Sequence, residues 1–229
     1  MNTPAKPKAH WYFDYISPYA YLQFHQMDRF TERLDITLEP VLFAGLLNAW
    51  GQLGPAEIPQ KRIATYKFCT WQAHRMGLPF RTPPTHPYNP LATLRLTLAR
   101  GANAPDVEKI FDTIWGQGLD VADPKVFADL KASLGPAPGP ELDDQAAKQA
   151  LKKNTDAAVA KGVYGVPTFA IEDATAENGW RLFWGFDAGD WMLDWLDNPD
   201  MFAEPAMQAA DDCQVGARRR RPEEKTKQA

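Results

Sequence analysis

The serine–proline pair Ser17-Pro18 is the first place in the chain where residue types point to chemistry. Serine before proline is typical of a helix start, with the serine as N-cap and the proline in the first helical position. The chain contains only one other serine, Ser133. A hydroxyl here caps a helix at the least, and it can also donate a hydrogen bond to a thiolate that another molecule brings. Direct nucleophilic attack by Ser17 is disfavoured, because the sequence places no histidine to deprotonate it.

Thiol activation by such a hydroxyl is energetically reasonable. A free thiol has a pKa of about 8.5 and is only a few per cent ionised at about pH 7, and lowering that pKa by about two units takes about 2.7 kcal/mol. A helix N-terminus contributes about 0.3–1 kcal/mol, up to about 2. A hydrogen bond to a charged group adds roughly 1.5–3 kcal/mol. The hydroxyl and the helix N-terminus are therefore sufficient together, whereas neither is comfortably sufficient alone.

A second motif, Gly165-Val166-Pro167-Thr168-Phe169, places a proline at the start of an apolar run. Proline cannot donate to a strand ladder and is tolerated at the first strand residue, where it shapes a special turn. Cis peptide bonds in proteins occur almost only before proline, typically in tight turns. We therefore expect a cis-proline turn at Pro167, at the start of a core strand.

The elements around these motifs follow from residue patterning. An aromatic alternation from Trp11 to Tyr15 predicts a strand, and apolar spacing predicts an amphipathic helix over 18–33. A second strand, parallel to the first, is expected to end at or just after Pro40. The further predicted ranges are 60–76, 90–100, 105–116 and 123–134 for helices, 142–162 for a long helix, 166–171 and 180–184 for strands joined by a turn at 177–179, and 187–196 for a last helix.

This order is βαβ, a helical middle segment, then αββα. It predicts an α/β fold, namely a thioredoxin-like domain with an inserted all-helical domain. The discontinuous thioredoxin-like domain is expected at 10–43 and 143–200, and the helical insertion at 44–142. Flexible tails are expected at 1–9 and 201–229.

Composition narrows the classes of function. The 229 residues carry 25 Lys and Arg against 29 Asp and Glu, a net charge of −4. The last twelve residues hold six basic and two acidic side chains, so the preceding 217 carry a net charge of −8, which disfavours binding to nucleic acid. The basic end is expected to be a solvated tail, with an electrostatic docking tail as the alternative. No apolar run approaches the roughly 18 residues that span a bilayer, and the N-terminus lacks the apolar stretch of a secretory signal.

The two cysteines, Cys69 and Cys213, lie far apart and form no C-x-x-C pair. That pattern argues against a disulfide framework and a zinc site, and it is typical of a reducing, cytoplasmic setting. Cys69 and His74 share a helical stretch without further metal-ligating residues, so we expect no metal. Dithiol oxidoreduction is excluded because Ser17 and Ala20 leave no redox pair.

Five motifs occur in one order over residues 10–197. They are Phe13-Asp14-Tyr15-Ile16-Ser17-Pro18-Tyr19-Ala20-Tyr21-Leu22, Gly51-Gln52-Leu53-Gly54-Pro55, Ile114-Trp115-Gly116-Gln117-Gly118, Gly165-Val166-Pro167-Thr168-Phe169 and Phe183-Trp184-Gly185-Phe186-Asp187. Each motif is modest alone. In combination they resemble the 2-hydroxychromene-2-carboxylate isomerases and, more distantly, the kappa-class glutathione transferases.

The resemblance implies that glutathione binds in the cleft between the thioredoxin-like domain and the helical insertion. It implies that Ser17 contacts the glutathione sulfur, and that the backbone of Val166, next to Pro167, pairs with the glutathione cysteine. The γ-glutamyl end would be held by the loop of Trp184, Gly185, Phe186 and Asp187. Asp187 suits the γ-glutamyl ammonium, and the amides that begin the last helix suit its carboxylate. A plain helix cap is the competing role for Asp187.

Family members place polar or basic side chains of the insertion against a substrate carboxylate. The corresponding positions here hold Leu47, Glu57 and Ile58, and His86 falls roughly where the family presents a substrate-facing ring. A plain loop histidine is the alternative for His86. The candidate substrate residues are Leu47, Trp50, Glu57 and His86. Three cations lie nearby: Lys61, Arg62 and Lys67. They either replace the absent side chain that would bind the substrate carboxylate or are solvated on a helix surface.

The resemblance implies a glutathione-dependent cis–trans isomerase of this type, which acts on a small, unsaturated substrate from aromatic catabolism. The thiolate activated by Ser17 would add to a conjugated double bond, the bond would rotate, and elimination would return glutathione. Two alternatives stay open: a kappa-like glutathione transferase or peroxidase that consumes glutathione, and a non-catalytic thioredoxin-fold binding protein. We expect a small-molecule substrate, no nucleic acid and no membrane as partners, and leave a homodimer open.

Overall fold

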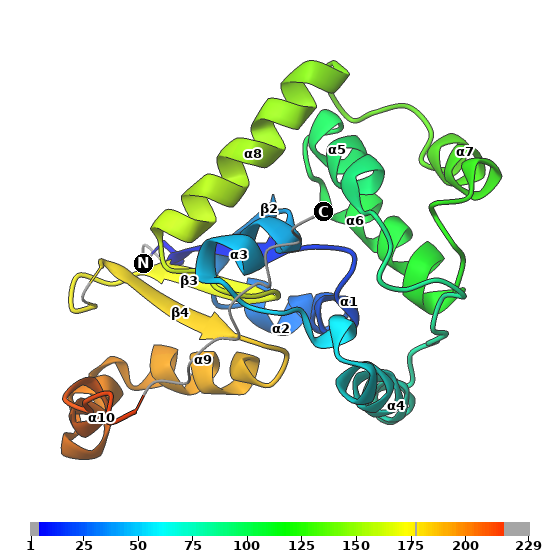
Figure 1. The fold of residues 1–229 in the computed structure, drawn as a ribbon. Helices are drawn as coiled ribbons and strands as arrows, with labels where there is room; N and C mark the ends of the chain where they lie inside the picture. Colours follow the sequence, from blue (N-terminus) through cyan, green and yellow to red (C-terminus); the bar gives the residue numbers. More distant parts are fainter. Residues whose placement is uncertain (1–4, 177, 218–229) are drawn as a thin grey trace, which may run out of the picture. The chain divides into compact units, whose positions relative to one another are not determined.

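A four-stranded mixed sheet unites segments from both halves of the chain (Figure 1). The computed structural model describes residues 5–176 and 178–217. The strands are β1 (Lys8–Phe13), β2 (Asp35–Pro40), β3 (Thr168–Glu172) and β4 (Trp180–Trp184), in the order β2-β1-β3-β4. β1 and β2 are parallel, as the sequence predicts, whereas β3 is antiparallel to both β1 and β4.

β1 is buried on both faces because each of its aromatic residues has apolar partners. Trp11 and Phe13 are fully buried on one face, where their ring centroids lie 4.7 Å apart and Phe111 packs 5.8 Å from Phe13. Tyr12 points to the opposite face and belongs to a second apolar cluster. The other buried members of that cluster are Val41, Leu46, Ala158, Val163, Val166 and Ala170.

The first helix is shorter than the sequence predicts. In place of one helix over 18–33, the chain forms α1 (Pro18–Phe24) and α2 (Met27–Thr31). His25 leaves α-helical geometry, with φ −72° and ψ 3°. Its ring lies 2.9 Å from a carboxylate oxygen of Asp112. A polar contact with a distant segment therefore accompanies the end of α1, although the apolar periodicity continues.

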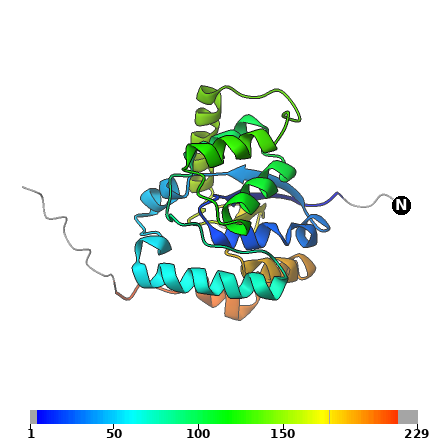
Figure 2. The ribbon, with the colours of Figure 1, turned by 90° about the vertical axis from the view of Figure 1, so that its right-hand side faces the viewer.

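The described residues between β2 and β3 form helices and no strand, as predicted for the insertion. The long helix α4 runs beside α1 (Figure 2). One helix, α3, is absent from the predicted ranges. The elements are α3 (Phe43–Trp50), the 3-10 turn η1 (Pro55–Glu57), α4 (Pro59–Met76), α5 (Leu91–Ala99), α6 (Ala104–Phe111), the π-helical turn η2 (Asp112–Gly116), α7 (Pro124–Ser133) and α8 (Asp144–Ala160).

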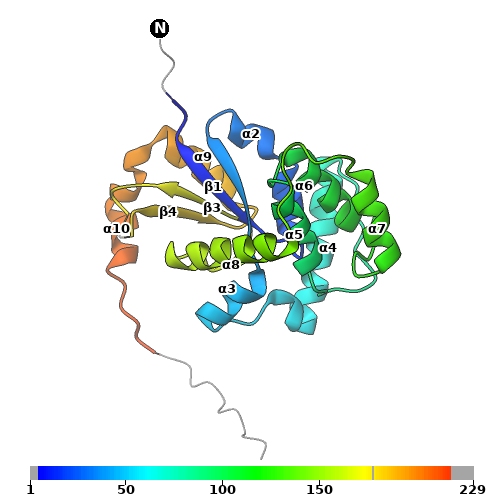
Figure 3. The same cartoon turned by 90° about the horizontal axis from the view of Figure 1, so that it is seen from above.

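Helices cover both faces of the sheet. α3 and α8 lie on the face of Tyr12, since Leu46 and Ala158 belong to its cluster, and α8 crosses the strands in the view from above (Figure 3). α1 and α2 lie on the opposite face, where Phe24 packs 5.8 Å from Trp11. The sheet is therefore covered by α3 and α8 on one face and by α1 and α2 on the other.

The chain divides into two compact units within α9 (Ala188–Asp197), one ending at Trp191 and the other beginning at Met192. The predicted domain boundaries near residues 44 and 143 both fall inside the first unit, and the division into a thioredoxin-like domain and an insertion stays a prediction.

Both predicted tails contain regular structure at their inner ends. β1 begins at Lys8, inside the predicted tail 1–9. The second unit contains η3 (Pro199–Ala203) and α10 (Pro205–Asp211), so the expectation of a flexible tail from residue 201 is wrong for these residues. The basic segment 218–229 and Glu177 of the predicted hairpin turn lie outside the described residues.

Candidate functional site

Ser17 lies at the junction of β1 and α1 and caps the helix, as predicted. Its Oγ accepts a hydrogen bond from the backbone N–H of Ala20 at 3.2 Å, and its own backbone is extended, with φ −93° and ψ 113°. The hydroxyl donates to the carbonyl oxygen of Val166 at 3.4 Å, and Ser17 is only 7% exposed. The two motifs singled out in the sequence, 149 residues apart, therefore meet at this hydroxyl.

The peptide bond between Val166 and Pro167 is cis. The carbonyl of Pro167 accepts a hydrogen bond from the backbone N–H of Gly185 at 2.9 Å, which joins the cis-proline turn to the loop after β4. Glycine is favoured at position 165, because a Cβ there would lie 2.3 Å from Nε1 of Trp184 and would displace the indole. The turn is thus packed directly against the first residue of the predicted γ-glutamyl loop.

The loop of Trp184, Gly185, Phe186 and Asp187 is also joined to α1, through Gln23. The side-chain amide of Gln23 donates to the carbonyl of Gly185 at 2.9 Å and accepts from the indole N–H of Trp11 at 2.6 Å. Gln23 is fully buried. The sequence analysis did not identify Gln23. The signal that could have found it is a polar residue within an otherwise apolar predicted helix.

A cavity of about 430 Å³ adjoins this loop. The rings of Tyr164 and Trp184 meet there at a centroid distance of 5.1 Å, and Trp184 is 51% exposed. Asp187 is the one carboxylate among the described lining residues, so the cavity suits a cationic group. The lining residues are Tyr164, Leu182, Trp184, Asp187, Ala188 and Trp191.

Asp14 is a fully buried carboxyl close to Ser17. Its two oxygens accept hydrogen bonds from the backbone N–H groups of Ile16 at 3.1 Å and Phe43 at 2.9 Å. Burial raises the pKa of Asp14 to about 7, although the two backbone hydrogen bonds act in the opposite direction. The carboxyl thus ties the strand–helix junction to the start of α3. Its signal in the sequence was a charged residue inside an aromatic run.

The candidate substrate residues of α3 and η1 make contacts within the protein. Trp50 donates its indole N–H to the carbonyl of Val163 at 2.9 Å, shortly before the cis-proline turn. Glu57 is exposed and accepts from the backbone N–H of Gly54 at 2.6 Å, which closes the η1 turn. Leu47 is buried on α3. The structure therefore joins Trp50 to the segment before the turn and places Glu57 in a local turn; their substrate role stays a prediction.

His86 directs both ring nitrogens to protein groups. Nε2 lies 2.7 Å from the carbonyl oxygen of Ile16, and Nδ1 lies 2.5 Å from Oη of Tyr66. Because a carbonyl only accepts, Nε2 carries the proton and the hydroxyl of Tyr66 donates to Nδ1. Burial lowers the pKa of His86, which favours the neutral ring. His86 thereby reaches, from the insertion, the residue that precedes Ser17.

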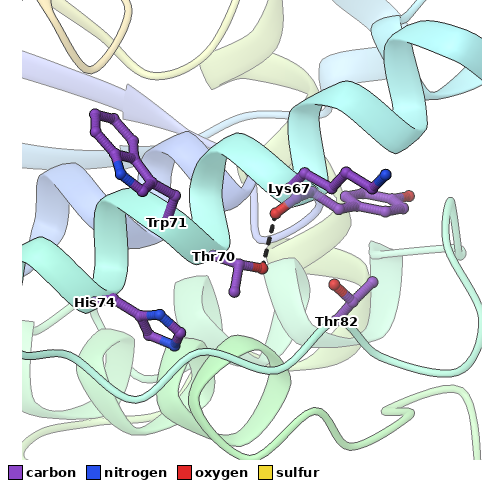
Figure 4. Close-up of a pocket in the computed structure, with 6 residues that line it drawn as sticks. Lys67, Thr70, Trp71, His74 and Thr82 are labelled. Atoms are coloured by element: carbon purple, nitrogen blue, oxygen red, sulfur yellow. Dashed lines mark hydrogen bonds between the residues drawn. The ribbon is translucent and has the colours of Figure 1, made fainter.

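A second cavity, of about 380 Å³, lies along α4 (Figure 4). Tyr66, Thr70 and His74 follow one another at four-residue spacing and therefore share one flank of the helix. Tyr66 connects this cavity to the Ser17 junction through its bond to His86. Of the nearby cations, Lys67 lines the cavity, whereas Arg62 donates to the carbonyl of Ala56 at 3.5 Å. The lining residues are Tyr66, Lys67, Thr70, Trp71, His74 and Thr82.

Cys69 lies on α4 and is buried, and burial raises its pKa to about 12. It is therefore protonated at neutral pH and is not a source of thiolate for Ser17. Cys213 is exposed and belongs to the second unit. Within residues 5–176 and 178–217, no group of three His, Cys, Asp or Glu side chains could hold a metal ion. None of the helices described in these ranges is long and apolar enough to cross a membrane.

The chain is similar in sequence to glutathione S-transferase kappa 2 of Caenorhabditis elegans, with 26% identity over 213 residues that cover 86% of this chain and 94% of the relative. It is also 26% identical to a 2-hydroxychromene-2-carboxylate isomerase of Pseudomonas putida over 190 residues, which cover 77% of this chain and 88% of the relative. These relatives confirm the resemblance that the five motifs indicated.

The fold is similar to a solved structure of a 2-hydroxychromene-2-carboxylate isomerase, with a TM-score of 0.64 at 21% identity, covering 90% of this chain and 100% of that chain. The thioredoxin-like fold class predicted from the order of elements is thereby confirmed. Residues 10–196, which include Ser17 and the cis-proline turn, match the family described as DSBA-like thioredoxin domain. The chain therefore belongs to the DSBA-like thioredoxin domain family.

Proposed function

We propose that the protein is a glutathione-dependent isomerase of the 2-hydroxychromene-2-carboxylate isomerase type, in which Ser17 stabilises a glutathione thiolate. The observation that carries the proposal is the meeting of the Ser17 hydroxyl with the carbonyl of Val166, beside cis-Pro167. The kappa glutathione transferase and the isomerase among the relatives support glutathione as the cofactor. We place this activity in the cytoplasm and in aromatic catabolism.

The Ser17 hydroxyl is arranged to donate a hydrogen bond to an incoming anion. Its bond to the Val166 carbonyl is 3.4 Å long, which is weak for an O–H donor, so the hydroxyl can turn to a thiolate at little cost. The N–H of Ala20 continues to donate to Oγ and strengthens the O–H as a donor. A bond to a charged acceptor contributes about 1.5–3 kcal/mol, which is roughly one to two pKa units of the thiol. Because α1 has only seven residues, we assign most of the stabilisation to this hydroxyl.

The cis-proline turn and the loop after β4 would hold the rest of the tripeptide. The backbone of Val166 would pair with the cysteine of glutathione, as a strand edge pairs with an extended peptide. The carboxylate of Asp187 would take the γ-glutamyl ammonium in the adjoining cavity of about 430 Å³. The N–H groups at the start of α9 would take the γ-glutamyl carboxylate. Trp184, Gly185 and Phe186 complete this part of the proposed site.

Glutathione, when bound, supplies a thiolate that can add to a conjugated double bond and leave again once the bond has rotated. The protein's own task is to keep that sulfur ionised and to hold it in place. Ser17 does the first through its hydroxyl, and Val166 and Asp187 do the second. On the substrate side, the resemblance suggests Leu47, Trp50, Glu57 and His86, of which His86 has both ring nitrogens bonded within the protein.

A kappa-like glutathione transferase or peroxidase is the second candidate. It is favoured by the kappa relative from Caenorhabditis elegans, because the alignment covers 94% of that protein. Product analysis separates the two: free glutathione is recovered after many turnovers of an isomerase, whereas a transferase or peroxidase leaves a stoichiometric conjugate or disulfide. A calorimetric titration that shows no binding at millimolar glutathione would instead favour a non-catalytic binding protein.

The decisive variant is Ser17→Ala, assayed against a panel of conjugated ring-fission products. We expect turnover to fall about 10–100-fold, the equivalent of one hydrogen bond to a charged group, while the fold and much of the glutathione affinity remain. Ser133→Ala is the matched control, because its hydroxyl bonds the carbonyl of Leu130 at 2.7 Å, on α7. Wild-type turnover in Ser17→Ala would remove this hydroxyl from the mechanism.

A further inference from the structure

We infer that His86, supported by Tyr66, is a positioning residue that fixes the peptide between Ile16 and Ser17 and so directs the Ser17 hydroxyl. The inference rests on the proposed function, because it concerns how Ser17 is set for the glutathione sulfur. It gives His86 a role different from the substrate-facing one that the resemblance implies.

The bonds of His86 form a direct link from the insertion to the junction of β1 and α1. The Nε2–H donates to the carbonyl of Ile16 at 2.7 Å, across 70 residues of sequence. Tyr66, on α4, holds Nδ1 at 2.5 Å, with the two rings nearly perpendicular at 85°. With both nitrogens engaged and the tautomer fixed, the ring cannot turn without losing a hydrogen bond.

A second insertion side chain binds the neighbouring carbonyl. Trp115 donates its indole N–H to the carbonyl of Tyr15 at 2.8 Å, and its ring packs 5.1 Å from the ring of His86. The carbonyls of two consecutive residues are therefore both fixed in direction. Since each carbonyl lies in a rigid peptide plane, the two bonds together set the backbone that leads into Ser17.

The backbone N–H of Ser17 belongs to the peptide plane that His86 fixes, and it donates to the carbonyl of Asp14 at 3.0 Å. Loss of the His86 bond would leave this plane held by the Asp14 bond alone and would let it tilt. The Ser17 hydroxyl would then no longer be held opposite Val166. We expect the thiolate to lose stabilisation, whereas the affinity for the peptide part of glutathione, which Val166 and Asp187 provide, changes little.

The test compares two substitutions of the same residue. His86→Leu removes both hydrogen bonds, whereas the amide of His86→Gln can donate to Ile16 and accept from Tyr66. The readout is the pKa of the bound glutathione thiol, measured from the ultraviolet absorbance of the thiolate against pH, with Ser17→Ala as the reference. Hydrogen exchange at the Ser17 amide is measured by NMR without glutathione.

We expect His86→Leu to raise the thiol pKa by about one unit and to lower kcat about tenfold, while KM for glutathione changes less than about threefold. The exchange of the Ser17 amide should quicken at least about tenfold. His86→Gln should bring the thiol pKa, kcat and the amide exchange rate most of the way back to their wild-type values. Tyr66→Phe should give values between those of His86→Leu and His86→Gln. The control is Ser133→Ala on α7, whose hydroxyl bonds the carbonyl of Leu130, and it should change neither readout.

An unchanged thiol pKa in His86→Leu would overturn the inference, even if the amide exchanged faster, because the bond would then be structural only. A loss that His86→Gln does not restore would also overturn it, since the imidazole itself would be needed, as in substrate contact. If the wild type binds no glutathione, the proposed function fails, and the exchange rates alone decide whether His86 holds Ser17. Should His86→Leu not fold, Tyr66→Phe carries the same comparison.

Discussion

The two parts of the candidate site are held in different ways. The turn region, which consists of Ser17, residues 165–167 and residues 184–187, is joined by contacts between distant segments, and the bond from Ser17 to Val166 spans 149 residues. The α3–α4 segment, residues 43–76, combines a long-range bond from Trp50 to Val163, 113 residues away, with a local one from Gly54 to Glu57, three residues apart. A backbone change at residues 165–167 of the turn region should therefore affect the fold and glutathione binding together, whereas loss of the Ser17 hydroxyl alone should lower turnover. A change at the local contact of Glu57 in the α3–α4 segment should alter substrate choice with little other effect.

The largest expected effect concerns Asp14, beneath the turn region. Its pKa in the folded protein, about 7, lies above the ordinary value of 3.8 because of burial. The folded state therefore binds this proton more tightly than the unfolded chain does. The free energy of unfolding is expected to fall as pH rises from about 4 to about 7, by on the order of 4 kcal/mol from this group. Urea unfolding of the wild type and of Asp14→Asn across this range measures the effect.

The difference in unfolding free energy between the wild type and Asp14→Asn separates the contribution of Asp14 from those of other carboxyls. Burial acts to raise the pKa of Asp106, for example, but hydrogen bonds from Arg100 and Asn103, together with the charges of Arg100 and Lys109, lower it overall. That group stabilises the fold as pH rises, and its contribution is the same in both proteins. Equal slopes of unfolding free energy against pH in the wild type and in Asp14→Asn would contradict the prediction.

The residues that sequence patterning could identify carry local signals. The proline after Ser17 indicates the helix cap, and the position of Pro167 at the start of a strand indicates the cis peptide bond. The helix α3 was missed because Leu42, at its N-cap position, makes no side-chain cap. The first N–H groups of α3 are instead satisfied by distant partners, Asp14 for Phe43 and Thr155 for Leu42.

Long-range contacts explain the other differences between sequence and structure. α1 ends at Phe24, and His25, the next residue, lies against Asp112, 87 residues away. Gln23 joins Trp11 to a loop 162 residues further along. Neither Asp112 nor Gly185 can be deduced as a partner from spacing, since each contact exists only after distant segments have packed together. The positions of Ser17 and Pro167 were therefore predictable from the sequence. The side chains that hold their surroundings in place through long-range hydrogen bonds were not.

An intermediate effect is expected for Gly165→Ala in the turn region. The added Cβ would lie 2.3 Å from Nε1 of Trp184, and 3.0 Å from two of its ring carbons. The indole must move, and such overpacking costs about 1–3 kcal/mol. We expect the free energy of unfolding to fall by that amount and the glutathione affinity to fall about tenfold. Chemical denaturation and calorimetry measure the two losses on the same samples.

Two further variants show whether the clash is the cause. Gly139→Ala is the matched control, because a Cβ at that position meets no atom within 4 Å, and its stability should stay within about 0.5 kcal/mol of the wild type. Adding Trp184→Ala to Gly165→Ala should relieve the clash, so that the alanine at 165 costs less than in the single variant. A cost that is the same in both backgrounds would mean that the two residues do not interact.

The smallest effect is expected for Glu57 in the α3–α4 segment. Glu57→Ala removes the acceptor of the Gly54 N–H at a partly buried turn, which costs about 0.5–1.5 kcal/mol, and Glu57→Gln should keep most of that bond. Neither variant should alter glutathione affinity, because the contact is local. If calorimetry shows weaker glutathione binding in Glu57→Ala, the two parts of the site are coupled and the contrast between them fails. Glu57→Gln could instead leave stability intact and change KM for the unsaturated substrate. The carboxylate would then face that substrate, and substrate specificity would reside in the α3–α4 segment.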